Sequence, residues 1–429
     1  MNNPLRKIFK GDTIIWTVFV VLILLSVLQV FSAISYLAYR SSSYVSPIQQ
    51  HIRYLIIGII ITFLFVNVRW FRPTTKFFRL LSYFGLLGSW GLLLYVLTKE
   101  RIGDAARFLE LGPISFQPSE LAKFFLIITV ADMLDTESCM LAYIVSRIRG
   151  YAFSFNPKQQ FGVILVMLAV TCVLIAVENL STALLLGGVI FVMLCLSNVS
   201  WGKIFTLLAT IILFMTLCWG VSKLIPDDMK SNNKVVEKVV GFLHRFPTWE
   251  SRIVEFVKSD DETKFQITDK NLQVVHAQRA IARGGIAKFG PGTSIERDYL
   301  PNAYNDFIFA IVIEEYGLVG GVVVIFLFLL LLGRAPAIAW KQKSSYATLL
   351  VFGSAFIIVF QAIINMAVSV SFGPVTGQPL PLMSKGGTSI VFVCAYFGMI
   401  LNLSNKEIKD ENLIEIKDGK EDDEFQILD

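Results

Sequence analysis

The sequence of 429 residues predicts an all-α polytopic membrane protein with about ten transmembrane helices. Its composition supports this fold class, because 55% of the residues are hydrophobic and only 17% are charged. An average soluble domain has about 25% charged residues. Long apolar runs also recur at lengths that suit a hydrocarbon core about 30 Å thick. We therefore expect most of the chain to lie within a bilayer.

The apolar runs place the expected helices along the chain. The first run follows Arg6, Lys7 and Lys10 and is longer than a signal-peptide core of roughly 7–15 residues, so we expect an uncleaved helix. The fourth run is short, with about 13 residues where about 20 are needed to cross the bilayer. We expect it to sit in a protected polar setting or to line a cavity. The expected spans are residues 13–38, 52–69, 79–98, 119–134, 161–177, 181–198, 203–224, 307–333, 347–371 and 387–404.

The charges of the short connections predict the orientation. Lysine and arginine gather in one set of connections, which the positive-inside rule places in the cytoplasm together with both termini. The basic residues of this set are Arg69, Arg72, Lys76, Arg79, Arg147, Arg149, Lys158, Lys203, Arg334, Lys341 and Lys343. Four further loops and a tight turn near residues 178–180 fall on the opposite, extracytoplasmic side.

Three parts follow from this topology. Residues 1–12 form a cytoplasmic N-terminal segment, and residues 13–404 form the membrane domain. A large extracytoplasmic loop, about 225–306, separates the seventh and eighth helices. Within it, valines of 234–246 fall at helical spacing, which fits an amphipathic helix at the membrane interface or a small helix of the loop equally well. Residues 405–429 are acidic overall and predict a disordered cytoplasmic tail.

Cysteines, histidines and basic residues exclude some classes of site. The five cysteines form no Cys-x-x-Cys pair, and the three histidines lie far apart in the sequence, so no metal site is predicted. No basic cluster with interleaved aromatic residues indicates nucleic acid. No cofactor is indicated with certainty, and a requirement for a divalent cation stays open.

The first candidate cluster begins the short fourth helix. Pro118 suits the first helical position, with Gln117 before it and Glu120 in the first turn. Lys123 lies one turn further and can face both Glu120 and Ser119. A lysine in a polar cavity could bind a phosphate group as a point charge. The alternative is a capped helix with a local ion pair.

The second cluster is the glycine-rich stretch 278–292. It begins with Gln278 and combines four glycines with Arg279, Arg283 and Lys288. A glycine-rich backbone with cations nearby can hold an anion. A flexible turn region is the alternative, and composition alone favours it.

The third cluster stands at the start of the eighth span. Asn305 is a plausible N-cap, which would put Asp306 in the first turn, where the helix dipole favours an anion. Glu314 would lie about 12 Å deeper and about 80° round a straight helix, so it could face one cavity with Asp306. Glu315 would point away, and the two glutamates are expected to hold neighbouring helices or to shape the cavity floor. The alternative makes Asp306 only a helix-start acid.

The fourth cluster is the loop 373–389, which is rich in proline and glycine. It is expected to bring Lys385 and the hydroxyls of Ser384, Thr388 and Ser389 to the outer face, or to be only a rigid connection. Carboxylates, cations and a short helix on one face together predict a site for an anionic, lipid-linked substrate.

Several motifs resemble one family. Phe116–Lys123 (FQPSELAK), residues 300–317 and Pro379–Ser389 (PLPLMSKGGTS) are similar to signatures of the SEDS family, which includes FtsW and RodA. The likeness is collinear from about Asp12 to Leu403. The chain departs from the family at Glu178–Thr182, which reads ENLST where PDLGT is usual, and we assign no role to Asn179 there.

The resemblance implies a peptidoglycan glycosyltransferase of the bacterial inner membrane that polymerises lipid II on the outer face. It implies a class B penicillin-binding protein as transpeptidase partner, with other division proteins. The family's catalytic aspartate falls on Asp306, which would act as general base. The candidate substrate-binding residues are Lys123, Glu120, Arg279, Arg283, Lys385 and Ser384. The candidate supporting residues are Gln117, Glu314, Glu315 and Gln278.

Residues 11–16 and 32–35 resemble the FtsW branch more than the RodA branch, which favours a role in cell division over elongation.

Two other functions stay open. The intramembrane residues Glu314, Glu315 and Lys123 would also suit a flippase for a lipid-linked precursor. A non-catalytic activator of a transpeptidase is the third reading. Since the polar clusters gather on the outer side, the enzyme is favoured.

Overall fold

The computed structural model describes most of the chain between residues 9 and 405. The described ranges are 9–34, 45–98, 109–111, 114–135, 138–149, 154–197, 199–224, 271–288, 290–300 and 303–405. The expected helix within 234–246 and the acidic tail from residue 406 onward lie outside the described residues.

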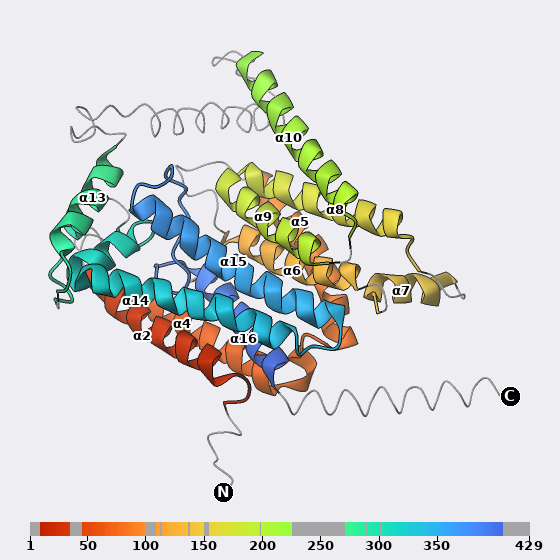
Figure 1. Ribbon diagram of the computed structural model, residues 1–429, viewed down its shortest axis with the longest axis horizontal. Coiled ribbons are helices and arrows are strands. Elements are labelled where there is room, and N and C mark those ends of the chain that lie inside the picture. Colours follow the sequence, from red (N-terminus) through yellow and green to blue (C-terminus); the bar gives the residue numbers. More distant parts are fainter. Residues whose placement is uncertain are drawn as a thin grey trace, which may run out of the picture.

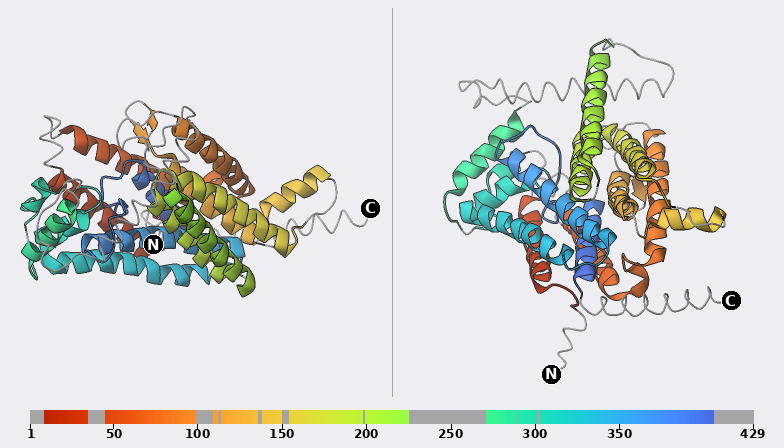
Figure 2. Two further views of the ribbon diagram at one scale, coloured as in Figure 1. Left: turned by 90° about the horizontal axis from the view of Figure 1, so that it is seen from above. Right: turned by 45° about the vertical axis from the view of Figure 1, so that its right-hand side comes forward.

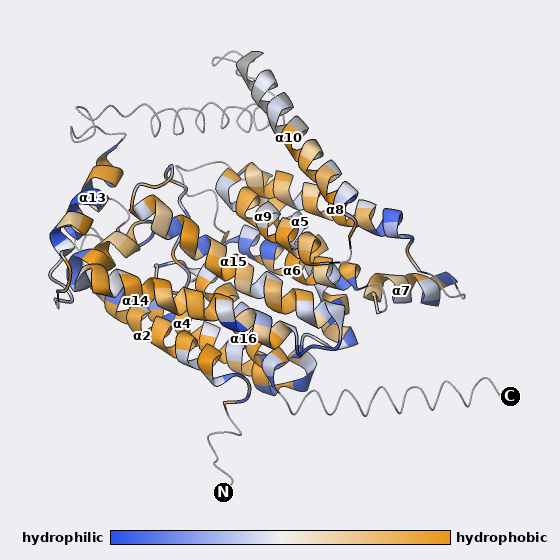
Figure 3. Ribbon diagram, in the orientation of Figure 1, coloured by the Kyte–Doolittle hydropathy of each residue, from blue (hydrophilic) through white to orange (hydrophobic). Residues whose placement is uncertain are grey.

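The long helices lie roughly along one axis and form a bundle (Figure 1). Apolar residues fill the middle of the bundle, and hydrophilic residues gather towards its two ends (Figure 3). A helix stands at each of the expected spans: α2 (Thr13–Ala33), α4 (Val45–Asn67), α5 (Lys76–Thr98), α6 (Pro118–Leu134), α8 (Pro157–Ala176), α9 (Leu180–Leu196), α10 (Trp201–Leu224), α14 (Ile308–Ala339), α15 (Ser345–Ser369) and α16 (Thr388–Ser404). Among the described residues, six helices are long and apolar enough to cross a membrane.

Several shorter elements connect these helices. They are η1 (Arg69–Phe71), an antiparallel hairpin of β1 (Leu109–Leu111) and β2 (Ile114–Phe116), α7 (Met140–Arg149), α13 (Leu272–Gly284) and η3 (Glu296–Asp298). Periodicity of apolar runs does not reveal such short pieces. Helix α13 lies within the expected large loop, so part of that loop is helical. In Figures 1 and 2, α10 leans away from the bundle, and its buried side chains Ile204 and Leu207 lie near its start.

The short helix α6 is enclosed by protein. Fourteen of its 17 residues are buried, so it has almost no surface for lipid. Helices α5, α8, α15 and α16 all pack against it. Its polar side chains therefore stand in a protected setting, as the sequence analysis expected, and a helix too short to span comfortably is tolerated there.

The two ends of the membrane domain meet. The side chain of Asp12 caps α2, and its Oδ2 accepts hydrogen bonds from Arg334 at 2.8 and 2.7 Å. The backbone N–H of Asp12 donates to Ser404 Oγ at 2.8 Å. The start of α2 and the end of α16 therefore lie at the same end of the bundle. Because Arg334 has this partner, α14 can continue to Ala339, six residues beyond the expected end of the span.

Helix α14 is broken at Gly317, where a single continuous helix was expected. Gly317 has φ 73° and ψ −174°, a conformation that only glycine adopts readily. The N–H groups of Leu318 and Val319 cannot make helical bonds across the break. They donate instead to the carbonyls of Gly285 and Ile286 at 3.0 and 3.1 Å. The glycine-rich segment therefore completes α14 at this point.

Replacing Gly317 with alanine should destabilise the protein. A Cβ atom there would stand 2.7 Å from the carbonyl oxygen of Ile286, and the positive φ adds strain. We expect a loss of about 1–3 kcal/mol, seen as a lower Tm of the purified protein in detergent. Gly333→Ala is the matched control, because a Cβ atom at this site of the same helix meets nothing within 4 Å. An equal Tm for both variants would contradict the account of the break.

Candidate functional site

The last loop runs over residues 370–388, including Thr388 at the start of α16, and joins several helix starts. The side chain of Gln378 donates to Thr182 Oγ1 at 2.7 Å, at the beginning of α9. The backbone N–H of Gln117 donates to Thr388 Oγ1 at 3.0 Å, directly before α6. The loop thus gathers elements from distant parts of the sequence at one end of the bundle.

The same loop holds the turn that carries Asp306. The N–H of Lys385 donates to the carbonyl of Tyr304 at 3.0 Å. The hydroxyl of Ser384 donates to the carbonyl of Asn305 at 2.5 Å. Two successive carbonyls of the turn therefore bond to two successive residues of the last loop, which fixes where the next residue, Asp306, can stand.

Asp306 stands before α14, so the prediction that it lies in the first turn was wrong. The helix begins at Ile308, and its N-cap is Phe307, without a side-chain cap. Asn305 cannot serve as the cap because the bonds to the last loop hold residues 304–306 in a turn. The Asp306 side chain is partly exposed and lies beside the last loop. Its Oδ2 is 4.0 Å from the point where a side chain at Gly377 would place its Cβ.

Lys123 and Glu120 form a buried ion pair. The Lys123 Nζ lies 2.8 Å from Glu120 Oε1, and the lysine side chain is only 1% exposed. Pro118 occupies the first helical position after Gln117, as expected. Since Gln117 is bonded to the last loop, the pair lies one turn inside the bundle from that loop.

Lys385 lies over the ring of Tyr304, with its Nζ 5.7 Å from the ring centroid. Burial lowers the pKa of the Lys385 amine below its ordinary value. The hydroxyl-bearing residues Ser384, Thr388 and Ser389, expected at the same outer face, are all buried. Ser384 also accepts a bond from the N–H of Leu380 at 2.7 Å, so its hydroxyl satisfies a buried backbone group of the loop.

Two cations of the second cluster, Arg279 and Arg283, lie on α13, which was not expected to be helical, whereas Lys288 follows this helix. Arg279 is exposed to solvent. The guanidinium of Arg283 lies 2.7 Å from Glu296, so its charge is already shared. Gln278 donates to Ser371 Oγ at 3.0 Å and thereby connects α13 to the start of the last loop.

Three amides of the glycine-rich stretch bond to α14, which supports the turn-region alternative for them over an anion cradle. The N–H of Gly290 donates to the carbonyl of Glu315 at 3.1 Å, and that of Lys288 donates to Tyr316 at 3.4 Å. The N–H of Gly292 donates to the carboxylate of Glu315 at 3.0 Å. These donors complete the broken helix and leave none of the three amides for an external anion.

Glu314 and Glu315 are buried and hold neighbouring segments. The carboxylate of Glu314 accepts the hydroxyl of Ser294 and, at 3.0 Å, the N–H of Ile295. The carboxylate of Glu315 accepts the hydroxyl of Ser32 on α2. The expectation that Glu314 shares a cavity with Asp306 was wrong, because residues 294–296 enclose its carboxylate. The expected structural role of both glutamates matches these contacts.

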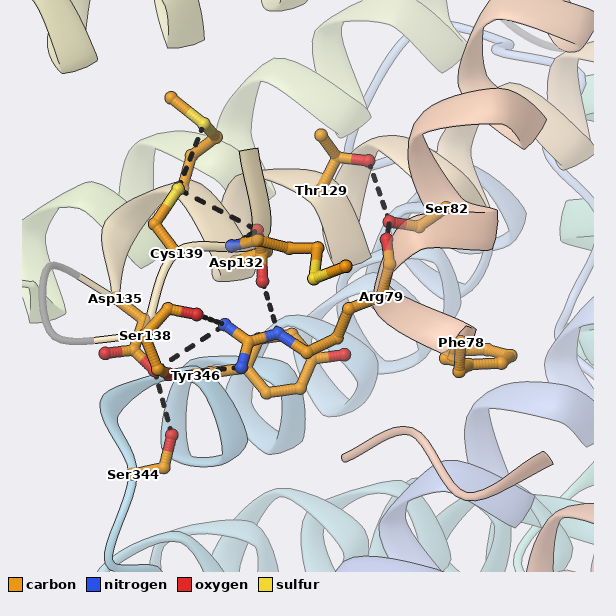
Figure 4. Close-up of polar contacts among 12 residues, drawn as sticks. Phe78, Arg79, Ser82, Thr129, Asp132, Asp135, Ser138, Cys139, Ser344 and Tyr346 are labelled. Carbon is orange, nitrogen blue, oxygen red and sulfur yellow. Dashed lines mark hydrogen bonds and ion pairs between the residues drawn. The ribbon is translucent and has the colours of Figure 1, made fainter. Parts of the chain in front are cut away.

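A polar cluster at the other end of α6 was missed (Figure 4). Asp132 forms an ion pair with Arg79 and accepts the Tyr83 hydroxyl at 2.6 Å and the N–H of Met140 at 2.9 Å. Arg79 also donates to the carbonyl of Ser138. The cluster therefore joins α5, α6 and α7. Its sequence signal was an aspartate near the end of the short helix, whereas Arg79 was counted only as a topology charge.

Breaking this pair should destabilise the protein strongly. Arg79→Met leaves the fully buried carboxylate of Asp132 without its cation, which costs about 3–5 kcal/mol. Thermal unfolding in detergent should show a large fall in Tm. The double variant Arg79→Met/Asp132→Met should recover part of that loss, since it removes both charges of the pair but leaves Asp135 without Arg79 and the Tyr83 hydroxyl without its acceptor. A double variant less stable than Arg79→Met would contradict the account.

The family model described as "Cell cycle protein", for FtsW, RodA and SpoVE, matches residues 12–409 of this chain. The chain belongs to the FtsW/RodA/SpoVE family. This confirms the family that the motifs predicted.

The family's curated members include relatives of moderate identity. The probable peptidoglycan glycosyltransferase FtsW of Bacillus subtilis is 30% identical over 304 residues, covering 70% of this chain and 68% of the relative. FtsW of Pseudomonas fluorescens is 27% identical over 364 residues, covering 82% and 78%. The peptidoglycan glycosyltransferase MrdB of Escherichia coli K12 is 25% identical over 302 residues, covering 70% of each chain.

Solved structures share the fold of this FtsW/RodA/SpoVE member. One, described as the structural coordination of polymerization and crosslinking by a peptidoglycan synthase complex, has a TM-score of 0.65 at 22% identity and covers 92% of this chain and 97% of its own. The crystal structure of Thermus thermophilus RodA has a TM-score of 0.54 at 20% identity, covering 92% and 96%. These likenesses identify a RodA-like helical fold. The family and the six membrane-capable helices among the described residues identify a multi-pass membrane protein.

Proposed function

We propose that this chain polymerises lipid II into glycan strands, with Asp306 as the general base. The predicted enzyme class is confirmed by the relatives, which are named peptidoglycan glycosyltransferases. The observation that carries the residue assignment is the position of Asp306. It stands before α14 in a turn bonded to the last loop, and the residue is partly exposed beside that loop, with its Oδ1 buried.

The reaction needs a base and a group that stabilises the leaving charge. Asp306 would take the proton from the acceptor sugar hydroxyl while that oxygen bonds to the donor's anomeric carbon. The bond from that carbon to undecaprenyl pyrophosphate breaks, and the pyrophosphate leaves with the electron pair. Lys385 is a cation held at the Asp306 turn, since its N–H bonds to that turn and its amine lies over Tyr304. It would neutralise the leaving group.

Other residues have less direct support. We keep Lys123 and Glu120 as a substrate-contacting pair, because Gln117 connects their helix to the last loop. Arg279 is exposed on α13 and is retained as a contact for the pyrophosphate, with Arg283 beside it. For Ser384 the proposal changes: it acts on the substrate through the turn that its hydroxyl holds.

The topology and partners belong to the same proposal. We place ten helices across a bacterial inner membrane, with both termini cytoplasmic, a membrane domain over 13–404 and the last loop on the outer face. The meeting of Asp12 and Ser404 supports a shared side for both ends. A class B penicillin-binding protein would crosslink the product, with other division proteins nearby. A neighbour's description, which joins polymerization to crosslinking in one synthase complex, supports such a partner.

The flippase alternative needs a polar path between the two ends of the bundle. Between Lys123 and Asp132, α6 carries only one polar side chain, Thr129, which is buried and donates to Ser82 at 3.3 Å. This stretch of α6 offers no polar path, and we therefore favour the enzyme.

Asp306→Asn should abolish polymerisation while leaving the fold intact. An amide is similar in shape but cannot accept the proton, so we expect the rate to fall by about 10²–10⁴-fold. Glycan synthesis by purified protein with its transpeptidase partner measures this. Asp298→Asn is the control, because Asp298 is an exposed acid in the same outer region and has no assigned role. Full glycan synthesis by Asp306→Asn would refute the assignment.

Lys385→Arg should move the alkaline limb of the pH profile. Burial lowers the pKa of Lys385, so its positive charge is lost at a lower pH than for an ordinary lysine. Arginine stays protonated, so the variant should keep activity to higher pH. Initial polymerisation rates between about pH 7 and about pH 10 test this. Lys343→Arg, at an exposed site, should leave the profile unchanged. An unmoved alkaline limb in Lys385→Arg would exclude Lys385 as the cation.

A further inference from the structure

The side chain of Asn365, near the end of α15, bonds directly to the residue that carries the candidate base. Its Nδ2 donates to the carbonyl of Asp306 at 2.8 Å and to the carbonyl of Gln378 at 2.8 Å. Carbonyl oxygens only accept, so the amide must present both of its hydrogens there. The residue is 1% exposed, which keeps competing water away from both bonds.

With this bond, the turn before α14 has three consecutive carbonyls with fixed partners. Tyr304 and Asn305 accept from the last loop, and Asp306 accepts from α15. Among these three bonds, only that of Asn365 reaches Asp306 itself. A side chain from a separate, largely buried helix thus anchors the main chain beneath the candidate base.

The second bond of Asn365 fixes the part of the last loop that faces Asp306. Gln378 directly follows Gly377, the residue that faces the Asp306 carboxylate. The side chain of Gln378 is itself tied to Thr182 on α9. One carboxamide therefore sets the spacing between the Asp306 main chain and the loop wall against which its carboxylate lies.

The position of Asn365 has a cost in free energy, because one of its polar atoms lacks a hydrogen bond. The Oδ1 of Asn365 is buried and has no partner among the residues that the structure describes. A buried acceptor without a bond is unfavourable. Asn365 therefore uses both of its donors at this position, although its acceptor is not satisfied.

We propose that Asn365 is a positioning residue that holds Asp306 at the distance from the last loop that proton transfer requires. The proposal rests on the proposed role of Asp306 as general base. Asn365 contacts no reacting atom in it. A general base works only within hydrogen-bond reach of its proton, and a displacement of about 1 Å can cost about 10²-fold in rate.

The test compares Asn365→Asp with Gln361→Glu. The first replacement has the same shape but puts an acceptor against two carbonyls, so the turn and the loop wall should separate. Gln361 is a matched control: it lies one turn earlier on α15, is 3% exposed, and donates to the carbonyl of Pro379 in the same loop at 2.9 Å. It anchors the loop but makes no contact with the Asp306 turn.

The readout is kcat and KM for lipid II polymerisation by full-length protein with its transpeptidase partner. We expect Asn365→Asp to lower kcat by about 10²-fold with little change in KM, and Gln361→Glu to keep a kcat within a few-fold of wild type. Asn365→Ser, which introduces no charge, should lower kcat in the same direction and guards against a folding defect of the first variant. Equal losses of kcat in Asn365→Asp and Gln361→Glu, or a wild-type kcat in Asn365→Ser, would overturn the proposal.

Asp306→Asn in the same assay separates this inference from the proposed function. If Asp306→Asn polymerises lipid II normally, the role of Asp306 fails. If Asp306→Asn is inactive and both Asn365 variants have the kcat of wild type, only the positioning role fails.

Discussion

Backbone groups inside a membrane protein need partners from the protein itself, and the break in α14 makes this constraint visible. At Gly317 the helical bonds stop, and residues 285–290 supply the missing donors and acceptors. That exchange pins the glycine-rich segment against α14 and buries Glu314 and Glu315 beside it. The first half of α14 is thereby held in place, and the turn with Asp306 stands at its start.

At the candidate site, the last loop supplies the partners that buried backbone groups need. Its own donors, with the side chain of Asn365, satisfy the turn carbonyls of residues 304–306, and one of these donors is the buried hydroxyl of Ser384. The basic residues of the candidate site fall into two groups by their exposure. Lys123 is buried and Lys385 is partly buried near the loop, whereas Arg279 and Arg283 lie exposed on α13. A substrate with a lipid tail and a charged head would meet both groups, which suits a polymerase that acts at the bilayer surface.

The sequence could predict features that depend on neighbours along the chain. Apolar runs located the long helices, and a spacing of three residues paired Glu120 with Lys123. It could not predict contacts between distant residues. Asp306 is bonded to a residue 59 positions away, Asn305 to one 79 away, and Arg79 to one 53 away. These tertiary bonds explain why the expected N-cap at Asn305 was wrong and why the Arg79–Asp132 cluster was missed. The family motifs, by contrast, singled out Asp306 as the candidate base without any knowledge of these bonds.

A structure of the protein with lipid II bound would test the central claim most directly. The account predicts that the acceptor sugar hydroxyl lies within about 3 Å of the Asp306 carboxylate, with the donor pyrophosphate on the side of Lys385. An acceptor hydroxyl bound out of reach of Asp306, with another side chain in contact with it, would contradict the account.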